Sequence, residues 1–331
     1  MAFIIQKYGG TSLADDASRE IIAKKVASER LQGNRIVLVV SAMGRRGDPY
    51  ATDTLLNLIK KYEGGADGLA LDLIASCGEI ISCCIISSLL NSKGIRALPM
   101  TAYSAGIEAE GPFGDATPKQ IESSCILKTL EDGLIPVIAG FQGIDEYGRI
   151  YTLGRGGSDT TAVALGIALA ADYVDIYKDV PGVAKADPHI IPHALYLDFL
   201  DHDSMFRLAK HGARVLHDKS AVLARDSGIK IRIRSAFDDS KGTLIAKPED
   251  GYKTPHFIGL TTNTRSDGRL KVTAVMARGE GREEKDRIAR LIETGGFSAV
   301  SIDCDDQDAL GFVCDPSDGK RFALALYSLL S

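Results

Sequence analysis

Short runs of apolar residues alternate along the chain with longer segments in which apolar positions recur at helical spacing. Continuous runs rich in Val and Ile are typical of strands that are buried on both faces of a parallel sheet. The predicted strands are residues 4–5, 36–40, 97–101, 135–139, 174–177 and 229–233. The predicted helices are a segment from about residue 15 and residues 53–61, 69–90, 160–171, 204–210 and 219–227. This alternation predicts an α/β fold with an open, mostly parallel sheet sandwiched by helices.

The pattern stops and restarts near residue 250. Residues 247–255 hold two prolines, one glycine and four charged residues, a composition that is typical of a linker. Further strands are predicted at residues 270–277, 297–302 and 310–313, and further helices at residues 283–293 and 321–330. We therefore expect a large domain over residues 1–246 and a small α+β domain over residues 256–331.

Composition narrows the class of protein. Of the 331 residues 25% are charged, and the formal net charge of -5 lacks the basic footprint of a nucleic-acid binder. None of the six cysteines forms a Cys-x-x-Cys pair, which favours a reduced, cytoplasmic protein without a zinc site. The N-terminus does not resemble a signal peptide, and we expect no apolar run of transmembrane length and no membrane partner.

Two glycines follow the first predicted strand, in the segment Lys-Tyr-Gly-Gly-Thr-Ser at residues 7–12. Glycines let the backbone approach an anion closely, and the helix that follows presents free N–H groups at its start. Lys7 adds a point charge that can reach a phosphoryl group. Taken alone, this segment is also compatible with an ordinary turn that carries an exposed lysine.

A second cluster, Gly-Arg-Gly-Gly-Ser-Asp-Thr-Thr at residues 154–161, precedes another predicted helix. Ser158 and Asp159 have an ordinary alternative role as helix caps. Arg155 between two glycines is better suited to bidentate capture of a carboxylate or a phosphate. A third segment, Ser-Ala-Met-Gly at residues 41–44, also follows a predicted strand. Ligands of open α/β sheets bind beyond the carboxyl ends of the strands, so we expect the three segments to converge on one crevice.

Together, these motifs resemble those of the aspartokinases, over roughly residues 1–246. The opening segment differs from the family's Lys-Phe-Gly-Gly-Thr-Ser only in Tyr8. The other segments that carry the resemblance are residues 41–44, 52–56, 78–79, 140–143, 154–160, 177–189 and 212–217. A short insertion at residues 46–51 is similar to the Bacillus-type single-chain enzymes.

The resemblance implies an amino-acid-kinase fold and transfer of the γ-phosphoryl group of ATP to the side-chain carboxylate of L-aspartate. The product would be 4-phospho-L-aspartate, at the first step of the aspartate-derived amino acid pathway. A carboxylate is already ionised at neutral pH and needs no general base, so catalysis rests on alignment and charge neutralisation. This agrees with the lack of a nucleophilic or metal-binding spacing among the six histidines.

The resemblance also implies roles for individual residues. Lys7 would neutralise the phosphoryl group, Asp159 would orient Lys7, and Arg155 and Glu79 would hold the α-carboxylate and the α-ammonium. The residues implied to bind the amino acid are Ser41, Thr52, Glu79, Arg155, Gly156, Gly157 and Ser158. The residues implied to bind ATP are Lys7, Gly9, Gly10, Thr11, Ser12, Lys178, Asp179, Gly182, Lys185, Asp187, Pro188, His189 and Arg214. Magnesium would bridge the β- and γ-phosphates, and no side-chain metal ligand is predicted.

The nucleotide segment departs from the family's pattern. Lys178 stands where the family has Thr, His189 where it has Arg, and Arg214 where it has Lys. Histidine is largely neutral near pH 7, so the change at position 189 predicts weaker phosphate binding. Lys178, Lys185 or Arg214 could compensate for that loss.

The C-terminal segment departs further. Aspartokinases usually end in two ACT modules that bind lysine or threonine and pair subunits, whereas this chain has room for one. The family's Asp-x-x-Gly effector turn is replaced by Gly-Glu-Gly-Arg at residues 279–282. We expect a single ACT-like domain that forms a homodimer contact.

Two alternatives stay open at this stage. The altered nucleotide segment is compatible with a catalytically weak regulatory or binding paralogue. A kinase with another carboxylate acceptor, such as glutamate or carbamate, is the other alternative. Arg155 and Glu79 favour a free α-amino acid, because they offer opposite charges to a zwitterion.

Overall fold

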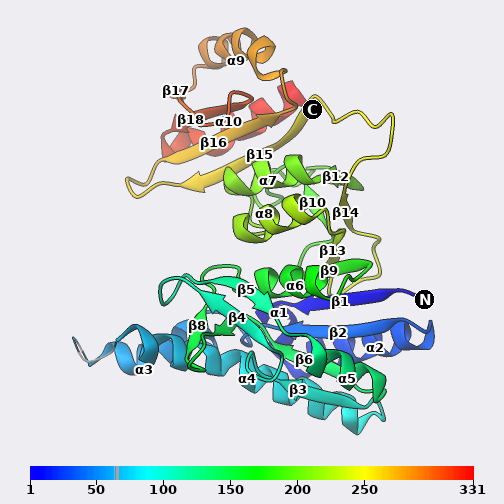
Figure 1. The fold of residues 1–331 in the computed structure, drawn as a ribbon. Coiled ribbons are helices and arrows are strands. Elements are labelled where there is room, and N and C mark those ends of the chain that lie inside the picture. The colour runs from blue at the N-terminus through cyan, green and yellow to red at the C-terminus, as the bar shows by residue number, and fades with distance from the viewer. Residues whose placement is uncertain (63, 65–66) are drawn as a thin grey trace. The chain divides into compact units, whose positions relative to one another are not determined.

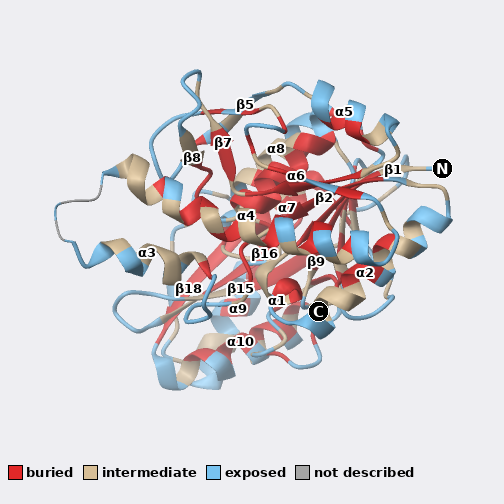
Figure 2. Cartoon of the chain, turned by 90° about the horizontal axis from the view of Figure 1, so that it is seen from below, coloured by how far each residue is buried: buried red, intermediate tan, exposed pale blue. Residues whose placement is uncertain are grey.

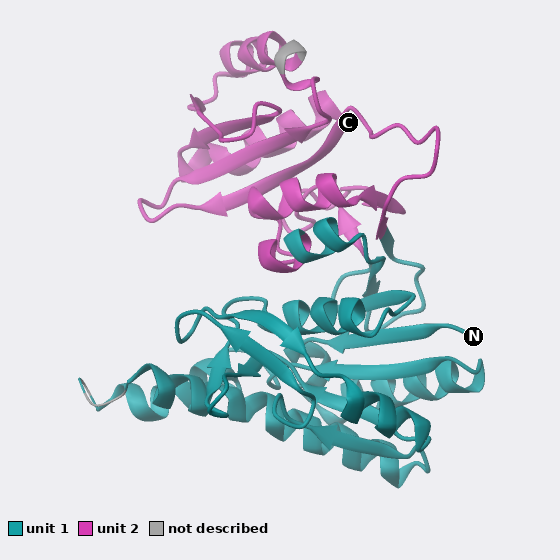
Figure 3. Cartoon of the chain, in the orientation of Figure 1, with its two compact units in different colours: residues 1–181, 222–244 teal, residues 182–221, 245–331 magenta. Residues whose placement is uncertain are grey.

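The computed structural model describes residues 1–62, 64 and 67–331, with the backbone alone for residues 282 and 283. The chain forms two compact units (Figure 3). Unit 1 comprises residues 1–181 and 222–244, and unit 2 comprises residues 182–221 and 245–331. Residues 182–221 thus pack with the C-terminal segment, although the predicted large domain includes them. The predicted domain boundaries therefore stay a prediction.

Unit 1 is built on a parallel sheet with the strand order β13-β9-β1-β2-β6-β3 (Figure 1). In β2, Arg-Ile-Val-Leu-Val-Val, every residue after the arginine is buried, as expected for a central strand that is covered on both faces. The strands are β1 (Phe3–Tyr8), β2 (Arg35–Val40), β3 (Ala97–Met100), β6 (Ile135–Ala139), β9 (Tyr173–Lys178) and β13 (Ile231–Ser235), and β14 (Thr243–Ala246) lies beside β13. The predicted open, mostly parallel sheet is confirmed.

Helices cover both faces of this sheet, and the central strands are buried between them (Figures 1 and 2). Helix α2 begins where the carboxylate of Asp15 accepts a hydrogen bond from the backbone N–H of Ser18, and α4 begins in the same way at Asp67. The helices are α1 (Gly10–Leu13), α2 (Asp16–Leu31), α3 (Thr52–Lys60), α4 (Gly68–Ser92), α5 (Ser124–Glu131) and α6 (Gly157–Ala168), and α8 (Asp218–Ser227) spans the boundary of the units. The helices predicted in this region are confirmed to within a few residues, and α5 was not predicted.

Helix α4 corrects one expectation from the sequence. By length and composition it could cross a membrane, although no apolar run of that length was predicted. Half of its most apolar 18-residue window is buried inside the structure, against β3 and β6. It also carries Asp72 and Glu79, both buried. The helix therefore serves as a core element of unit 1.

A small mixed sheet of unit 1, in the order β5-β4-β7-β8, was not predicted; its outer pairs are antiparallel and β4 pairs with β7 in parallel. Its strands are β4 (Ile107–Glu110), β5 (Thr117–Ile121), β7 (Gln142–Ile144) and β8 (Ile150–Thr152). The buried carboxylate of Asp72 joins this sheet to α4, because it accepts hydrogen bonds from Thr152 N at 2.7 Å, Thr152 Oγ1 at 2.9 Å and Gly114 N at 2.9 Å. The position of β8 matters because the second glycine cluster follows it directly.

Unit 2 contains a four-stranded antiparallel sheet in the order β15-β16-β18-β17. Apolar residues of this sheet pack with two helices into a separate core, in which Phe312 and Phe322 lie edge to face. The elements are β10 (Val183–Ala184), β11 (Tyr196–Leu197), β12 (Phe199–Asp201), α7 (His202–Lys210), β15 (Phe257–Thr264), β16 (Leu270–Met276), α9 (Gly281–Gly295), β17 (Val300–Ile302), β18 (Ala309–Cys314) and α10 (Pro316–Leu330). The predicted small α+β domain is present with one additional strand, β15.

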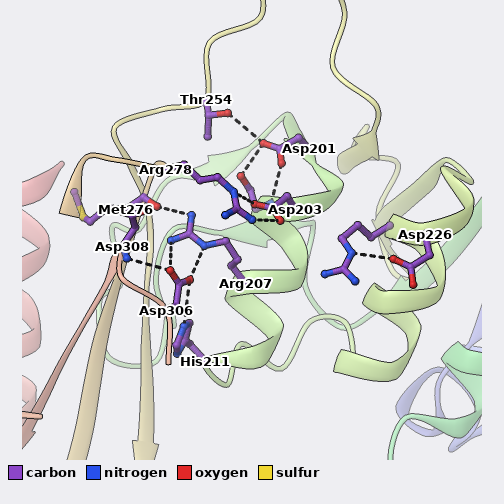
Figure 4. A network of polar contacts seen from close by, with 12 residues as sticks. Asp201, Asp203, Arg207, His211, Asp226, Thr254, Met276, Arg278, Asp306 and Asp308 are labelled. Carbon is purple, nitrogen blue, oxygen red and sulfur yellow. Dashed lines mark hydrogen bonds and ion pairs between the residues drawn. The ribbon is translucent and has the colours of Figure 1, made fainter. Parts of the chain in front are cut away.

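A polar network joins α7 to the loops of this sheet (Figure 4). Arg207 donates to both oxygens of Asp306, at 2.6 and 3.2 Å, and to the carbonyl of Met276 at 2.7 Å. The side chain of Arg207 is 5% exposed and that of Asp306 is 17% exposed. Nearby, Arg278 pairs with Asp203, but the Arg278 side chain is 73% exposed.

We expect Arg207→Met to lower the free energy of unfolding of unit 2 by about 3 kcal/mol, because it removes the guanidinium partner of a largely buried carboxylate and leaves the ring of His211, at 3.6 Å, beside it. Arg278→Met is the matched control and should cost less than about 1 kcal/mol, because water screens an exposed pair. Urea unfolding of both variants measures the difference. Equal losses in the two variants would contradict this account of the network.

Candidate active site

Three charged side chains meet at the carboxyl ends of the central strands. Lys7 lies near the end of β1, Lys178 ends β9, and Asp159 lies in the first turn of α6. Lys7 Nζ is 2.6 Å from Asp159 Oδ1, and Lys178 Nζ is 2.8 Å from Asp159 Oδ2. The side chains of Lys7 and Asp159 are 7% and 4% exposed. Sequence reasoning placed the first pair together but missed the contact between Lys178 and Asp159.

The turn after β1 requires glycine for a steric reason. A Cβ on Gly10 would lie 2.5 Å from the carbonyl oxygen of Gly44 and 2.7 Å from that of Ala42. The carbonyl of Gly10 also accepts a hydrogen bond of 2.9 Å from the N–H of Gly44. The segments at residues 7–12 and 41–44, which are separate in the sequence, are therefore in direct backbone contact.

Glycine also shapes the start of α6. Gly154 and Gly156 have φ angles of 73° and 69°, in the left-handed region that side chains disfavour. A Cβ on Gly157 would lie 2.7 Å from the ring of Phe141. These three positions hold the loop that carries Arg155 between β8 and α6, and they leave the Arg155 side chain exposed.

Gly78 brings Glu79 into the same region. A Cβ on Gly78 would lie 2.7 Å from the Ala42 Cβ and 2.9 Å from the carbonyl oxygen of Tyr50, so glycine lets α4 pack against the loop after β2. Glu79 is 3% exposed, and its Oε2 has no hydrogen-bond partner. The pattern Gly-Glu thus has a physical basis: the glycine allows the approach that buries the carboxyl group.

These groups surround a cavity of about 580 Å³ in unit 1. The cavity is lined by the following residues that the sequence predicted for catalysis or binding: Lys7, Gly10, Ser41, Thr52, Glu79, Arg155, Gly156, Gly157, Ser158 and Asp159. Gly9, Thr11 and Ser12 belong to the adjoining turn and helix α1. The lining also includes Leu56, Lys60 and Asp72, which sequence reasoning did not select. The spacing of Thr52, Leu56 and Lys60 on one face of α3 was a usable signal for two of them.

Burial sets the charge state of Glu79. Removal from water raises its pKa to about 8, against a weaker opposing effect of hydrogen bonds from backbone N–H groups and of Lys7. Without a ligand the carboxyl group is therefore largely protonated at pH 7. Because burial disfavours the ionised form of this group, its contribution to the free energy of unfolding depends on pH.

We expect this contribution to appear in the pH dependence of stability. Between pH 4.5 and about 8 the folded protein holds a proton on Glu79 that the unfolded chain has released. The free energy of unfolding should therefore fall as pH rises through this window, by at most ~1.4 kcal/mol per pH unit from this group. Glu79→Gln should remove that part of the slope, and urea unfolding from pH 5 to 8 measures it. Parallel curves for the two proteins would contradict the assignment.

The opposite shift occurs at Asp159. Burial acts to raise its pKa, but the charges of Lys178 and Lys7 outweigh burial and hold the pKa well below the usual range of a carboxyl group. Burial also lowers the pKa of Lys7, and the charge of Asp159 partly restores it. We conclude that Asp159 is ionised throughout the neutral range and that it anchors both lysines.

The residues predicted to bind ATP fall into two groups. Lys178 and Asp179 belong to unit 1, where Asp179 forms an exposed ion pair of 2.9 Å with Arg45. Lys7, Gly9, Gly10, Thr11 and Ser12 belong to unit 1 as well. The remaining residues belong to unit 2, namely Gly182, Lys185, Asp187, Pro188, His189 and Arg214. There, Asp187 accepts a hydrogen bond from the backbone of His189 within a turn. Their assembly with the cavity of unit 1 stays a prediction.

Within residues 1–62, 64 and 67–331, no group of three His, Cys, Asp or Glu side chains is arranged to hold a metal ion.

Comparison with known proteins identifies the family. The model of the amino acid kinase family matches residues 2–235. The chain belongs to this family. The resemblance to aspartokinases is thus confirmed, together with the amino acid kinase fold that it implied.

Curated relatives of this amino acid kinase include aspartokinases. It is 42% identical to the aspartokinase of Bacillus sp. strain MGA3 over 245 residues. This alignment covers 74% of this chain and 58% of that protein. It is 41% identical to an aspartokinase of Thermus thermophilus, over 74% of this chain and 59% of that protein. The chain thus spans less than two thirds of the length of these relatives. It is 32% identical to the aspartokinase of Corynebacterium glutamicum, over 97% of this chain and 76% of that protein.

Solved structures agree with this fold. Aspartokinase III of E. coli in complex with aspartate and ADP matches with a TM-score of 0.81 at 20% identity, over 99% of both chains. The aspartate kinase of Synechocystis matches with a TM-score of 0.65 at 30% identity, over 99% of this chain and 55% of that one. A UMP kinase from Bacillus anthracis has a TM-score of 0.54 at 19% identity, over 75% of this chain and 97% of that one. These matches at 20% and 19% identity show the fold alone.

Proposed function

We propose that this protein transfers the γ-phosphoryl group of ATP to the side-chain carboxylate of L-aspartate. One observation carries the proposal: the cavity of unit 1 is lined by the Lys7–Asp159 ion pair and by Arg155 and Glu79. A lysine beside an acceptor suits phosphoryl transfer, and an arginine with a carboxyl group suits the two ends of an α-amino acid. Similarity to the aspartokinases favours aspartate over glutamate or carbamate, and it favours an active enzyme over a weak paralogue.

The substrate would bind with its α-carboxylate on Arg155 and its α-ammonium on Glu79. Ser41 and Thr52 would then hold the reacting end, directed toward Lys7. An oxygen of the side-chain carboxylate attacks the γ-phosphorus, a new P–O bond forms, and the bond to the β,γ-bridging oxygen breaks to release ADP. No proton is removed from the nucleophile, because the carboxylate is ionised at neutral pH.

ATP would bind as its magnesium complex, and the metal would supply further neutralisation of phosphate charge. The lysines and the glycine backbones of the cavity are donors suited to phosphate oxygens. The nucleotide segment of unit 2 would supply the remaining contacts. We further infer a homodimer that forms through the C-terminal domain, where β17 is an edge strand with Val300 63% exposed. A cytoplasmic location stays a prediction.

The test of the reaction is an ATP-dependent hydroxamate assay with L-aspartate, run beside L-glutamate, N-acetyl-L-glutamate and bicarbonate with ammonia. We expect aspartyl hydroxamate and equimolar ADP with L-aspartate only. Folded protein that phosphorylates another acceptor, or none, would overturn the proposed substrate.

Binding of aspartate should release protons near pH 7. An ammonium group placed against Glu79 lowers the pKa of that carboxyl group, so the protonated form that burial favours must ionise. Calorimetry in buffers of different ionisation enthalpy measures the number of protons released. Glu79→Gln should bind aspartate more weakly and release none, whereas unchanged proton release in this variant would place the ammonium elsewhere.

A further inference from the structure

Asp159 has two carboxylate oxygens, and each is occupied by a different lysine. Oδ1 pairs with Lys7 at 2.6 Å and Oδ2 pairs with Lys178 at 2.8 Å. The Lys178 side chain is 20% exposed, against 7% for Lys7. Lys178 is therefore the more accessible of two ammonium groups that are held by one buried carboxylate.

The strands fix the positions of both lysines. β1 and β9 are adjacent and parallel, with Tyr8 opposite Tyr177 in the register. The rings of these tyrosines are fully buried and stack with centroids 4.5 Å apart at an interplanar angle of 3°. Successive side chains of a strand point to opposite faces, so Lys7 and Lys178 leave the sheet on the face opposite the tyrosines. The stack holds the two strand ends in register and thereby positions both ammonium groups.

The charges of this cluster do not balance. Two lysines against one aspartate leave an excess of one positive charge, and Glu79 does not cancel it because its carboxyl group is largely protonated at pH 7. The two ammonium groups also repel each other, which is one cause of the lowered pKa of Lys7. A structural ion pair needs one lysine, and a second one near the same carboxylate is unfavourable unless an anion offsets it.

We propose that Lys178 is a second cation of the phosphoryl-transfer site, which binds the transferring group together with Lys7 and acts mainly in the transition state. This inference rests on the proposed kinase function and deepens it. Negative charge spreads over the equatorial oxygens of the phosphoryl group during transfer, and two ammonium groups on one anchor would offset it from two directions.

The first test separates turnover from nucleotide affinity. We expect Lys178→Met and Lys178→Thr to lower kcat by about 10²- to 10³-fold, with the KM for ATP changed less than about 3-fold. Lys178→Arg should retain a cation and recover part of kcat. Lys128→Met is the matched control, because it removes a lysine from an exposed ion pair with Asp132 and should leave both constants unchanged.

The second test does not require turnover. Calorimetry should give wild-type protein and Lys178→Met similar affinities for Mg-ADP. With aluminium fluoride and L-aspartate added as a mimic of the planar phosphoryl group, the variant should bind Mg-ADP at least about 10-fold more weakly than wild type.

The outcomes distinguish the two proposals. If wild-type protein phosphorylates no acceptor, the kinase function itself is overturned. If wild type is active and Lys178→Met keeps its kcat, or loses only its affinity for ATP, the role of Lys178 in the transition state is overturned. If Lys178→Met unfolds, the comparison of Lys178→Arg with Lys178→Thr decides in its place, and equal kcat values in these two would overturn the role.

Discussion

Lys7→Met will abolish phosphoryl transfer and leave the protein folded. Lys7 lines the cavity beside Asp159 and is the cation that the proposed reaction places against the γ-phosphoryl group. Loss of one preorganised charge at such a position costs about 10³-fold in kcat. Folding should survive because Asp159 keeps its second partner, Lys178, so that no buried carboxylate is left unpaired.

The measurement is kcat with L-aspartate and Mg-ATP, together with a thermal unfolding curve. Lys128→Met serves again as the control for loss of a lysine in an exposed pair. We expect the Lys7→Met curve to remain cooperative with its midpoint close to that of wild type. A variant that keeps a wild-type kcat would remove Lys7 from the reaction, and collapse of the fold would show that Lys178 cannot sustain Asp159 alone.

Asp159→Asn will impair both turnover and stability, whereas Lys7→Met impairs turnover alone. The substitution leaves two ammonium groups close together, largely buried and without their counter-charge. We expect the free energy of unfolding to fall by about 3 kcal/mol or more, as for other buried ion pairs that lose one member. Turnover should fall at least as far as in Lys7→Met, because both cations lose the anchor that aligns them.

The pH dependence of stability gives an independent measure. The pKa of Asp159 is lowered by folding, so its contribution to stability is complete above the ordinary carboxyl pKa and is lost as pH falls toward the folded value. The difference in unfolding free energy between wild type and Asp159→Asn should therefore be constant near neutrality and shrink only in acid. A difference that already shrinks between pH 7 and 6 would contradict the charge state assigned to Asp159.

The fold and about half of the residues that line the cavity followed from local patterns and from the motifs that resemble those of the aspartokinases. Continuous apolar runs such as the one in β2 mark strands that are covered on both faces, so the parallel sheet was predictable. Parallel strands end at a common edge, so segments after β1 and β2 had to lie near each other. Glycines mark positions where a side chain cannot fit, and Gly10 and Gly78 are such positions in the structure.

Other features depend on pairings that the sequence does not encode locally. The strands β4, β5, β7 and β8 are short; β4 pairs with β5 and β7 with β8 as local hairpins, but the sheet also needs the pairing of Glu108 in β4 with Ile144 in β7, which α5 and β6 separate in the chain. Asp72 accepts a hydrogen bond from Thr152, which lies 80 positions away in the sequence, and the residues near Asp72 do not predict this contact. The packing of residues 182–221 with unit 2 is of the same kind, since it depends on long-range burial.

The sequence by itself determined that this protein is an α/β amino acid kinase with glycine loops for phosphate and with Lys7, Arg155 and Asp159 available at strand ends. The tertiary structure alone decided the charge states: that Glu79 is buried and largely protonated, and that Lys7 and Lys178 share one carboxylate. The physical reason is the distance over which each kind of interaction acts. Backbone conformation and apolar patterning act between near neighbours in the chain, whereas desolvation and Coulomb interactions depend on distances in space that exist only once the strands have paired.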